Sequence, residues 1–204
     1  MVREFTCHIK FMTELHVHRV VLMHEKAFPK FFMTLMGRPF LAAYYSIVLK
    51  YKGSISLISF DKHGEHTGFA VGFIDPSVFY KILKKNYFRL ILPVFLGLLR
   101  RPYLVLNILR GVLRVIKSKK RVDRGYTCEL ASIGVVKKGG GIGSGLLKKF
   151  VVEAIEKGAS DVCLTTDRYN NDSVIGFYRS FGFVDSGSEK RGNREMIEFV
   201  LLDI

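Results

Sequence analysis

The sequence has no acidic residue between Pro76 and Val122, a stretch that is rich in apolar side chains. Twelve basic residues lie there and carry most of the formal net charge of +14. They are Lys81, Lys84, Lys85, Arg89, Arg100, Arg101, Arg110, Arg114, Lys117, Lys119, Lys120 and Arg121. We interpret residues 77–121 as a basic, apolar insertion, and we expect two or three helices broken near Pro93 and Pro102.

Cysteine is scarce, and the three cysteines are widely spaced. Cys7, Cys128 and Cys163 form no CxxC pair and no cluster with histidine, which argues against a disulfide framework and a zinc site. Because Cys128 and Cys163 stand among apolar neighbours, we expect both in the core rather than as nucleophiles. The six histidines show no ligand spacing either, so no metal is expected.

Long apolar runs are absent as well. The longest is Leu90–Leu99, and ten residues are too few to cross a bilayer as a helix. The N-terminal residues MVREFTCHIK contain no apolar segment typical of a signal peptide. We therefore expect a cytoplasmic protein that is either soluble or peripherally attached to the inner face of the membrane.

The apolar pattern of the remaining sequence predicts strands that alternate with helices. Strands are expected at residues 3–12, 54–60, 67–74, 128–136, 161–166 and 196–202. Helices are expected at residues 15–28, 31–36, 39–49, 146–155 and 173–181. At 204 residues the chain fits a single domain, 1–204, that carries the insertion.

A glycine-rich turn lies between a predicted strand and a predicted helix. Gly139–Gly145 contains five glycines in seven residues, and Lys138 precedes it. Glycine lets backbone N–H groups converge on a ligand, and a helix N-terminus adds donors and partial positive charge, so the turn is a candidate anion site. A P-loop and a dinucleotide fingerprint are both excluded, because Leu146 stands where each needs another residue. A glycine-rich loop without a ligand remains the alternative.

Two segments resemble the GNAT (GCN5-related N-acetyltransferase) superfamily. The first is ELASIGVVKKGGGIGSGLL, residues 129–147, in which Lys138, Gly141 and Gly143 stand at the family's Gln/Arg-x-x-Gly-x-Gly/Ala positions. The second is NDSVIGFYRSFGF, residues 171–183, which is similar to the family's Asn-to-Tyr-x-x-x-Gly-Phe pattern. The clear match covers residues 127–204. The resemblance implies an α/β fold with a mixed, mostly antiparallel sheet, helices on both faces and, here, the added basic helical insertion.

The resemblance also implies acetyl-CoA as co-substrate, held without a metal. Backbone groups near Ile133, Val135 and Val136 are expected to bind the pantetheine arm, and Lys138 to face a phosphate. The pyrophosphate would be held by amides of Gly139, Gly140, Gly141, Ile142, Gly143 and Ser144. Asn171 matches a family position for a cofactor contact, although it also precedes a helix and could act as its cap.

Direct attack of an amine on the thioester requires two proton transfers. Tyr178 matches the family's general-acid tyrosine, and the alternative is an aromatic residue that only packs beside Phe177 and Phe181. Glu129 occupies a strand position where some family members place a general base. Its alternative is a surface carboxylate.

The expected activity is acetyl transfer to a primary amine, with an amino sugar, free or nucleotide- or lipid-linked, as the favoured small-molecule acceptor. The alternatives are protein or peptide N-acetylation, and a non-catalytic, membrane-associated acyl-CoA-binding module. The basic insertion could meet an anionic membrane surface, the substrate, its own domain or the second subunit of a homodimer. Nucleic acid is not expected, because the segment lacks a recognisable binding module.

Overall fold

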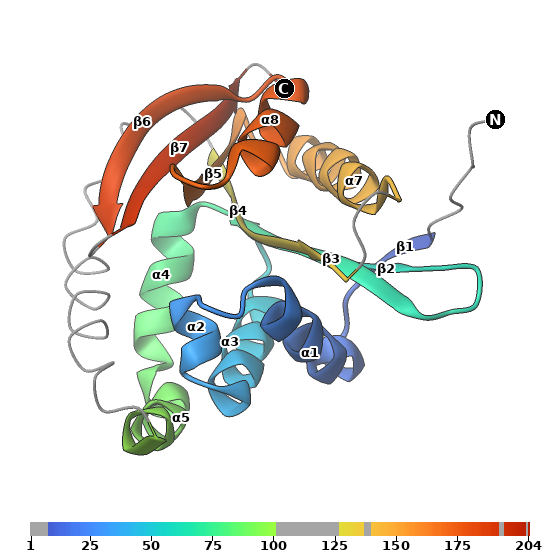
Figure 1. Cartoon of the computed structure of the whole chain (residues 1–204). Coiled ribbons are helices and arrows are strands. Elements are labelled where there is room, and N and C mark those ends of the chain that lie inside the picture. Colours follow the sequence, from blue (N-terminus) through green and yellow to red (C-terminus); the bar gives the residue numbers. More distant parts are fainter. Residues whose placement is uncertain (1–7, 101–126, 137–139, 192–193, 203) are drawn as a thin grey trace.

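The computed structural model describes residues 8–100, 127–136, 140–191, 194–202 and 204. Within them, seven strands form one sheet in the order β1-β2-β3-β4-β5-β7-β6 (Figure 1). The strands are β1 (His8–Phe11), β2 (Ser54–Phe60), β3 (His66–Ile74), β4 (Thr127–Val135), β5 (Asp161–Asp167), β6 (Val184–Arg191) and β7 (Arg194–Leu202). Neighbouring strands are antiparallel except for β4 and β5, which are parallel. The mixed, mostly antiparallel sheet expected from the sequence is confirmed.

Two helices cover one face of the sheet. Helix α7 (Ile142–Glu156) and helix α8 (Asp172–Ser180) pack Phe150 and Tyr178 into a cluster with Ile55 and Leu57 of β2 and Phe199 of β7. Phe150 and Phe199 have no exposed surface, and a fully buried side chain of this size contributes about 1.5–3 kcal/mol.

The opposite face carries the N-terminal helices and the described part of the insertion (Figure 1). These elements are η1 (Glu14–His16), α1 (Val17–Ala27), α2 (Phe32–Leu35), α3 (Arg38–Lys50), α4 (Pro76–Lys85) and α5 (Tyr87–Arg100). Val20 of α1, Leu41 of α3 and Phe79 of α4 are fully buried in a second cluster with Phe69 and Phe73 of β3. Helices therefore lie on both faces of the sheet, as expected.

The connections follow local sequence chemistry. In the β2–β3 hairpin, Oδ1 of Asp61 accepts hydrogen bonds from the N–H groups of His63 and Glu65, and Gly64 supplies a positive φ of 79°. Helix α4 begins at Pro76, and the side chain of Asp75 caps it by accepting from the N–H of Val78.

Strands β3 and β4 approach each other unusually closely at a bulge. The register shifts where Val71 pairs with Ser132 but Gly72 pairs with Leu130, so Ala131 is the extra residue. A β-carbon at Gly72 would lie only 2.1 Å from the carbonyl oxygen of Glu129, which is why glycine is required there.

The insertion differs in part from the expectation. Helix α5 continues through Pro93, so the predicted break there is wrong. The break lies at Asn86 instead, the C-cap residue of α4, whose φ of −93° and ψ of 18° leave the helical region and whose Nδ2 donates to the carbonyl of Ile82. The second predicted break, at Pro102, and the rest of the insertion from 101 to 121 lie outside the described residues, as do Cys7, Lys138 and Gly139.

Strand β6 was not predicted from the sequence. Its segment VDSGSEKR is polar, and its side chains are exposed or half-buried throughout, because it forms the edge of the sheet and pairs with β7 alone. In the described part of the chain, no helix combines the length and apolar character needed to cross a membrane.

Candidate active site

A gap opens between the two parallel strands at the centre of the sheet. Strands β4 and β5 pair only at Thr127, Cys128 and Glu129 of β4. Beyond Glu129, β4 pairs with β3 alone as far as Val135, and β5 pairs with β7 alone as far as Asp167. The two strands, both fully described, therefore separate and leave facing edges of backbone that are not bonded to each other.

The backbone of β4 presents alternate residues to this gap. The N–H of Val136 donates to the carbonyl of Thr67 at the end of β3, so Val136 faces β3. Because successive residues of a strand point their N–H and C=O groups to opposite edges, Val135 and Ile133 direct theirs to the gap. Of the three predicted pantetheine contacts, Ile133 and Val135 thus have suitable backbone orientation, whereas Val136 presents its backbone to β3.

The N-terminus of α7 provides unpaired donors beside the gap. Gly141 is the N-cap residue, with a φ of 69° that favours glycine, and no side chain caps the helix. The first bond of the helix joins the N–H of Gly145 to the carbonyl of Gly141. The N–H groups of Ile142, Gly143 and Ser144 therefore have no acceptor within the helix, and the helix dipole adds positive potential.

Packing within the described part of the protein does not explain why position 143 is a glycine. A β-carbon at Gly143 would lie 3.8 Å from Val135 Cγ1 and 3.8 Å from Phe177 Cζ, which is ordinary contact. Glycine inside a helix costs about 1 kcal/mol relative to alanine. The position between the end of β4 and α8 is therefore a candidate point of ligand approach. Gly140 is half-buried beside it.

Tyr178 lies on the inner face of α8. Its side chain is buried, and its ring packs against Phe183 and Phe199 with centroids 5.7 and 6.0 Å away. Burial raises the pKa of the Tyr178 phenol above its usual value, so the group stays protonated at neutral pH. The geometry therefore fits both the packing role and a proton donor.

Glu129 is held on the opposite face of the sheet, beside the point where the gap begins. The Tyr80 hydroxyl donates to Glu129 Oε1 at 3.0 Å. Burial and the nearby Glu129 raise the pKa values of Tyr80 and Tyr44, so both phenols remain neutral donors. Tyr80 belongs to α4, within the insertion, and sequence analysis missed it because no local pattern links it to Glu129. Glu129 is thus half-buried among aromatic groups rather than on the open surface.

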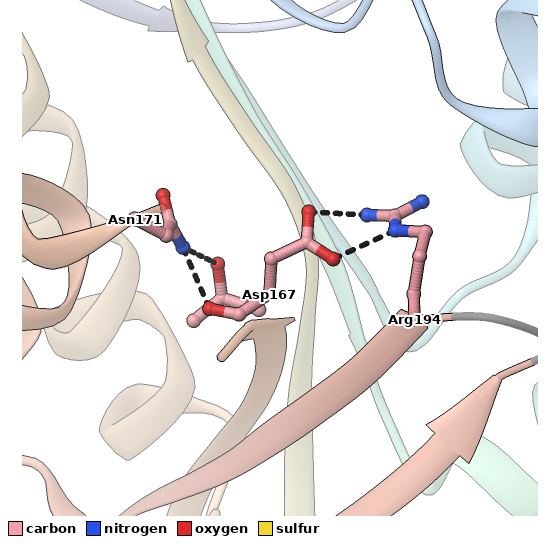
Figure 2. Close-up of polar contacts among 4 residues, drawn as sticks. Asp167, Asn171 and Arg194 are labelled. Carbon is pink, nitrogen blue, oxygen red and sulfur yellow. Dashed lines mark hydrogen bonds and ion pairs between the residues drawn. The ribbon is translucent and has the colours of Figure 1, made fainter. Parts of the chain in front are cut away.

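Asn171 ties the end of β5 to the start of α8 (Figure 2). Its Nδ2 donates to Thr166 Oγ1 at 2.8 Å and to the carbonyl of Asp167 at 3.0 Å. It occupies the N-cap position of α8, but its side chain makes no capping hydrogen bond with that helix. Asn171 was expected either to cap α8 or to contact the cofactor. Its hydrogen bonds show a third role, which is to fix the C-terminal end of β5.

Two arginines of the β6–β7 hairpin line the same end of β5. Arg194 forms a two-bond ion pair with Asp167, as Figure 2 shows, and its guanidinium carbon lies 4.3 Å from the centre of the Phe31 ring. Arg191 donates to Thr165 Oγ1 at 3.1 Å. The contact of Arg194 with Phe31 joins the hairpin to the α1–α2 connection, and the hydrogen bonds to Thr165 and Asp167 join it to β5. Sequence analysis missed both arginines, since they stand in a polar segment without periodicity.

Cysteine and metal chemistry have no support in the described residues. Cys128 and Cys163 are buried, as expected, and burial raises the pKa of the Cys128 thiol, which keeps it protonated. The described residues contain no group of three or more His, Cys, Asp or Glu side chains that could hold a metal ion.

No family model matches the sequence, and no curated protein sequence matches it. Solved structures do match. One is histone acetyltransferase HPA2 and related acetyltransferase from Corynebacterium glutamicum, with 16% identity, a TM-score of 0.62, and coverage of 97% of this chain and 97% of that chain. A second is NAA60 of Arabidopsis thaliana in complex with acetyl-CoA, with 15% identity, a TM-score of 0.61, and coverage of 97% and 98%.

A third structure, from Desulfovibrio desulfuricans, is described as an acetyltransferase of the GNAT family. It has 14% identity and a TM-score of 0.59, and the match covers 98% of this chain and all of that one. At these identities the similarity concerns the fold, and it extends over nearly the whole of each chain. This chain has the fold of the GNAT acetyltransferase superfamily.

Proposed function

We propose that this chain, acting as one domain, transfers the acetyl group of acetyl-CoA to a primary amine. The observation that carries the proposal is the combination of two features at one place. Strands β4 and β5 separate beyond Glu129, and the uncapped N-terminus of α7 lies beside the end of β4. The first feature offers strand-like hydrogen bonds to an extended arm, and the second offers amides to a pyrophosphate.

The proposed cofactor contacts follow the chain. Ile133 and Val135 would bind the amide groups of the pantetheine arm through their backbone. The N–H groups of Ile142, Gly143 and Ser144 would bind the pyrophosphate, joined by those of Gly139, Gly140 and Gly141. The Lys138 ammonium would add a point charge facing a phosphate. The NAA60 structure, which shares this fold, contains acetyl-CoA.

The proposed reaction is a direct attack that needs no acyl-enzyme. Acetyl-CoA supplies an activated thioester carbonyl. Glu129 accepts a proton from the ammonium form of the acceptor, a C–N bond forms and the C–S bond breaks. Tyr178 donates its phenol proton to the departing thiolate. Tyr178 belongs to the cluster on one face of the sheet, and Tyr80, the partner of Glu129, to the cluster on the other face. In this proposal the two groups therefore act from opposite sides of the separation of β4 and β5.

We propose a compact acceptor such as an amino sugar rather than a protein segment. The Arg194 side chain is held by Asp167 and lies over Phe31, so the β6–β7 hairpin and the α1–α2 connection are in contact. We propose that this contact narrows the approach to Glu129. An extended peptide would have to displace it, whereas a small amine would not.

Release of CoA, followed with a thiol reagent, tests the proposal. The wild type is incubated with acetyl-CoA and a panel of amines: amino sugars, nucleotide-linked amino sugars, polyamines and peptides with free N-termini. The expected result is turnover above background hydrolysis with a compact amine, and a much smaller rate in Glu129→Gln. Turnover with peptides alone would replace the proposed acceptor by a peptide. If none of the amines in the panel is acetylated although acetyl-CoA binds, the chain would instead be a non-catalytic binding module.

A further inference from the structure

Helix α5 has two apolar faces, and one of them packs against the described part of the protein. Leu90, Val94 and Leu98, spaced four residues apart, pack on a cluster that contains Met36 and Phe40. Large apolar side chains also point away from the protein and are 54–65% exposed. They are Tyr87, Phe88, Ile91, Leu92, Phe95 and Leu99. The spacing of Phe88, Leu92, Phe95 and Leu99 places them in one stripe along the helix.

Such a stripe is unusual on the surface of a soluble domain. Single exposed apolar residues are common, but a contiguous patch of large aromatic and aliphatic side chains marks a surface that meets another apolar phase or partner. By comparison, α7 exposes only Val152 and Ile155 among its large apolar side chains. The α5 stripe therefore needs a partner that can accept apolar side chains.

The charge around the stripe is of one sign. Helices α4 and α5 contain no acidic residue, and Lys81, Lys84, Lys85 and Arg89 are exposed on them. The Arg89 guanidinium lies 5.7 Å from the centre of the Phe88 ring, so a cation borders the stripe directly. The partner should therefore be anionic as well as apolar.

A basic cavity lies at the N-terminal end of the same helix. It has a volume of about 280 Å³ and is formed by residues of α3, α4 and α5 together with Tyr51 and Lys52. Lys50, Lys52 and Arg89 line it, together with Asn86 and the apolar residues Ile47 and Ile82. Lys50 Nζ lies 3.8 Å from Glu14 Oε1 in a loose, exposed pair. Arg89 belongs to both the cavity and the border of the stripe.

We propose that α5 docks on an anionic phospholipid surface. The stripe from Phe88 to Leu99 enters the boundary between headgroups and acyl chains, and the cavity around Arg89 holds a headgroup phosphate. A second copy of this chain fits less well, because a symmetric contact through α5 would bring the same cations face to face. The proposal does not depend on acetyl transfer.

Vesicle co-sedimentation tests the proposal. Purified wild type is mixed with vesicles of phosphatidylcholine alone, and with vesicles that contain a third of phosphatidylglycerol, at low and at physiological salt. Binding is expected only to the anionic vesicles, and it should weaken as salt rises. Leu92→Ser/Phe95→Ser should lower the partition coefficient at least about tenfold, since two apolar side chains that would enter the lipid are lost. Lys50→Glu/Arg89→Glu should do the same by removing two cations.

Val152→Ser/Ile155→Ser on α7 is the control, because it removes two exposed apolar side chains, 44% and 45% exposed, that lie outside the stripe, and it should leave vesicle binding unchanged. Absence of binding to anionic vesicles at low salt would overturn the proposal. So would equal binding by the stripe variant and the control. If the wild type binds no vesicles but forms a dimer, and Leu92→Ser/Phe95→Ser is a monomer, then the stripe contacts a second copy of the chain and not lipid. Saturable binding of inorganic phosphate without vesicle binding would reduce the cavity to an anion site.

Discussion

The hydroxyl group of Tyr80 donates a hydrogen bond to Glu129 Oε1 at 3.0 Å, although the two residues are 49 positions apart in the chain. Tyr80 comes from α4, at the start of the insertion, and Glu129 from the central strand where the sheet begins to separate. Burial and Glu129 together raise the pKa of Tyr80 well above its usual value, so the phenol remains a donor throughout the neutral range. The insertion thus contributes a side chain to the candidate active site.

If Glu129 is the base, then Tyr80→Phe should change how the rate depends on pH. A donor to a carboxylate favours the charged form, so removing it should move the acidic limb of kcat/KM toward higher pH. Glu129→Gln should remove that limb and lower kcat/KM by about 100-fold or more. Rates measured from pH 5 to 9 check this. A profile in Glu129→Gln that keeps the wild-type shape would exclude Glu129 as the base.

Tyr178→Phe should separate catalysis from packing. The ring contacts with Phe183 and Phe199 remain in this variant, so the unfolding temperature should change by only a few degrees. Loss of the proton donor should lower kcat by about 10²–10⁴-fold, with little effect on the KM for acetyl-CoA. Calorimetric unfolding and steady-state rates are the measurements. Full turnover in Tyr178→Phe would assign the residue to packing alone.

Arg194→Ala should widen acceptor choice without unfolding the protein. The Arg194–Asp167 pair is partly exposed, so its loss should cost only about 1 kcal/mol of stability. Without the contact to Phe31, peptides that are poor acceptors for the wild type should gain in kcat/KM relative to small amines. Arg168→Ala is the control, because Arg168 pairs with Glu195 at 3.4 Å in a similarly exposed position. If both variants use the same acceptors at the same relative rates, Arg194 does not determine acceptor specificity.

His24 should make the fold sensitive to acid. Its side chain is buried, with Nδ1 2.7 Å from the Tyr45 hydroxyl oxygen, and Nε2 has no partner in the described part of the chain. Burial lowers the pKa of His24 to about 4 from an ordinary value of 6.5. Because the folded pKa is the lower one, the stabilising contribution is present above pH 6.5 and is lost as pH falls through about 4. The loss should amount to about 3 kcal/mol.

Urea unfolding at pH 4 to 8 measures this loss. In His24→Gln, the decline of the unfolding free energy between pH 6.5 and 4 should be smaller by about that amount, whatever the absolute stability. The control is His63→Gln, in the exposed β2–β3 turn, which should keep the wild-type slope. A His24→Gln slope equal to that of the wild type would mean that His24 is not the group responsible.

Much of the architecture was predictable because core-facing residues repeat at the period of their element. Helix α7 packs Leu146, Leu147 and Phe150 on one side, and that spacing is visible in the sequence. The glycine turn was predictable for a different reason. Gly141 adopts a positive φ, which favours glycine, and a β-carbon at Gly143 would make only ordinary contacts, so neither glycine is set by core packing.

The parts that were not predicted depend on contacts between distant segments or on edges without a pattern. Strand β6 exposes side chains on both faces, so it carries no apolar alternation. The pairing of Tyr80 with Glu129 arises only when α4 packs on β3 and β4. Pro93 was expected to break the insertion, since proline cannot donate a helical hydrogen bond. The packing of Leu90 and Val94 on both sides of it holds α5 together.

The central claim is that acetyl-CoA binds at the N-terminus of α7, and titration calorimetry tests it most directly. Acetyl-CoA is titrated into the wild type and into two variants. Gly143→Leu would place a side chain between Val135 and Phe177. Gly176→Leu is the control, because Gly176 is exposed on α8 with open space around it. The account predicts a Kd in about the micromolar range for the wild type and for Gly176→Leu, and no measurable binding for Gly143→Leu. Folded wild type that binds no acetyl-CoA, or Gly143→Leu that binds it as well as the control, would contradict the account.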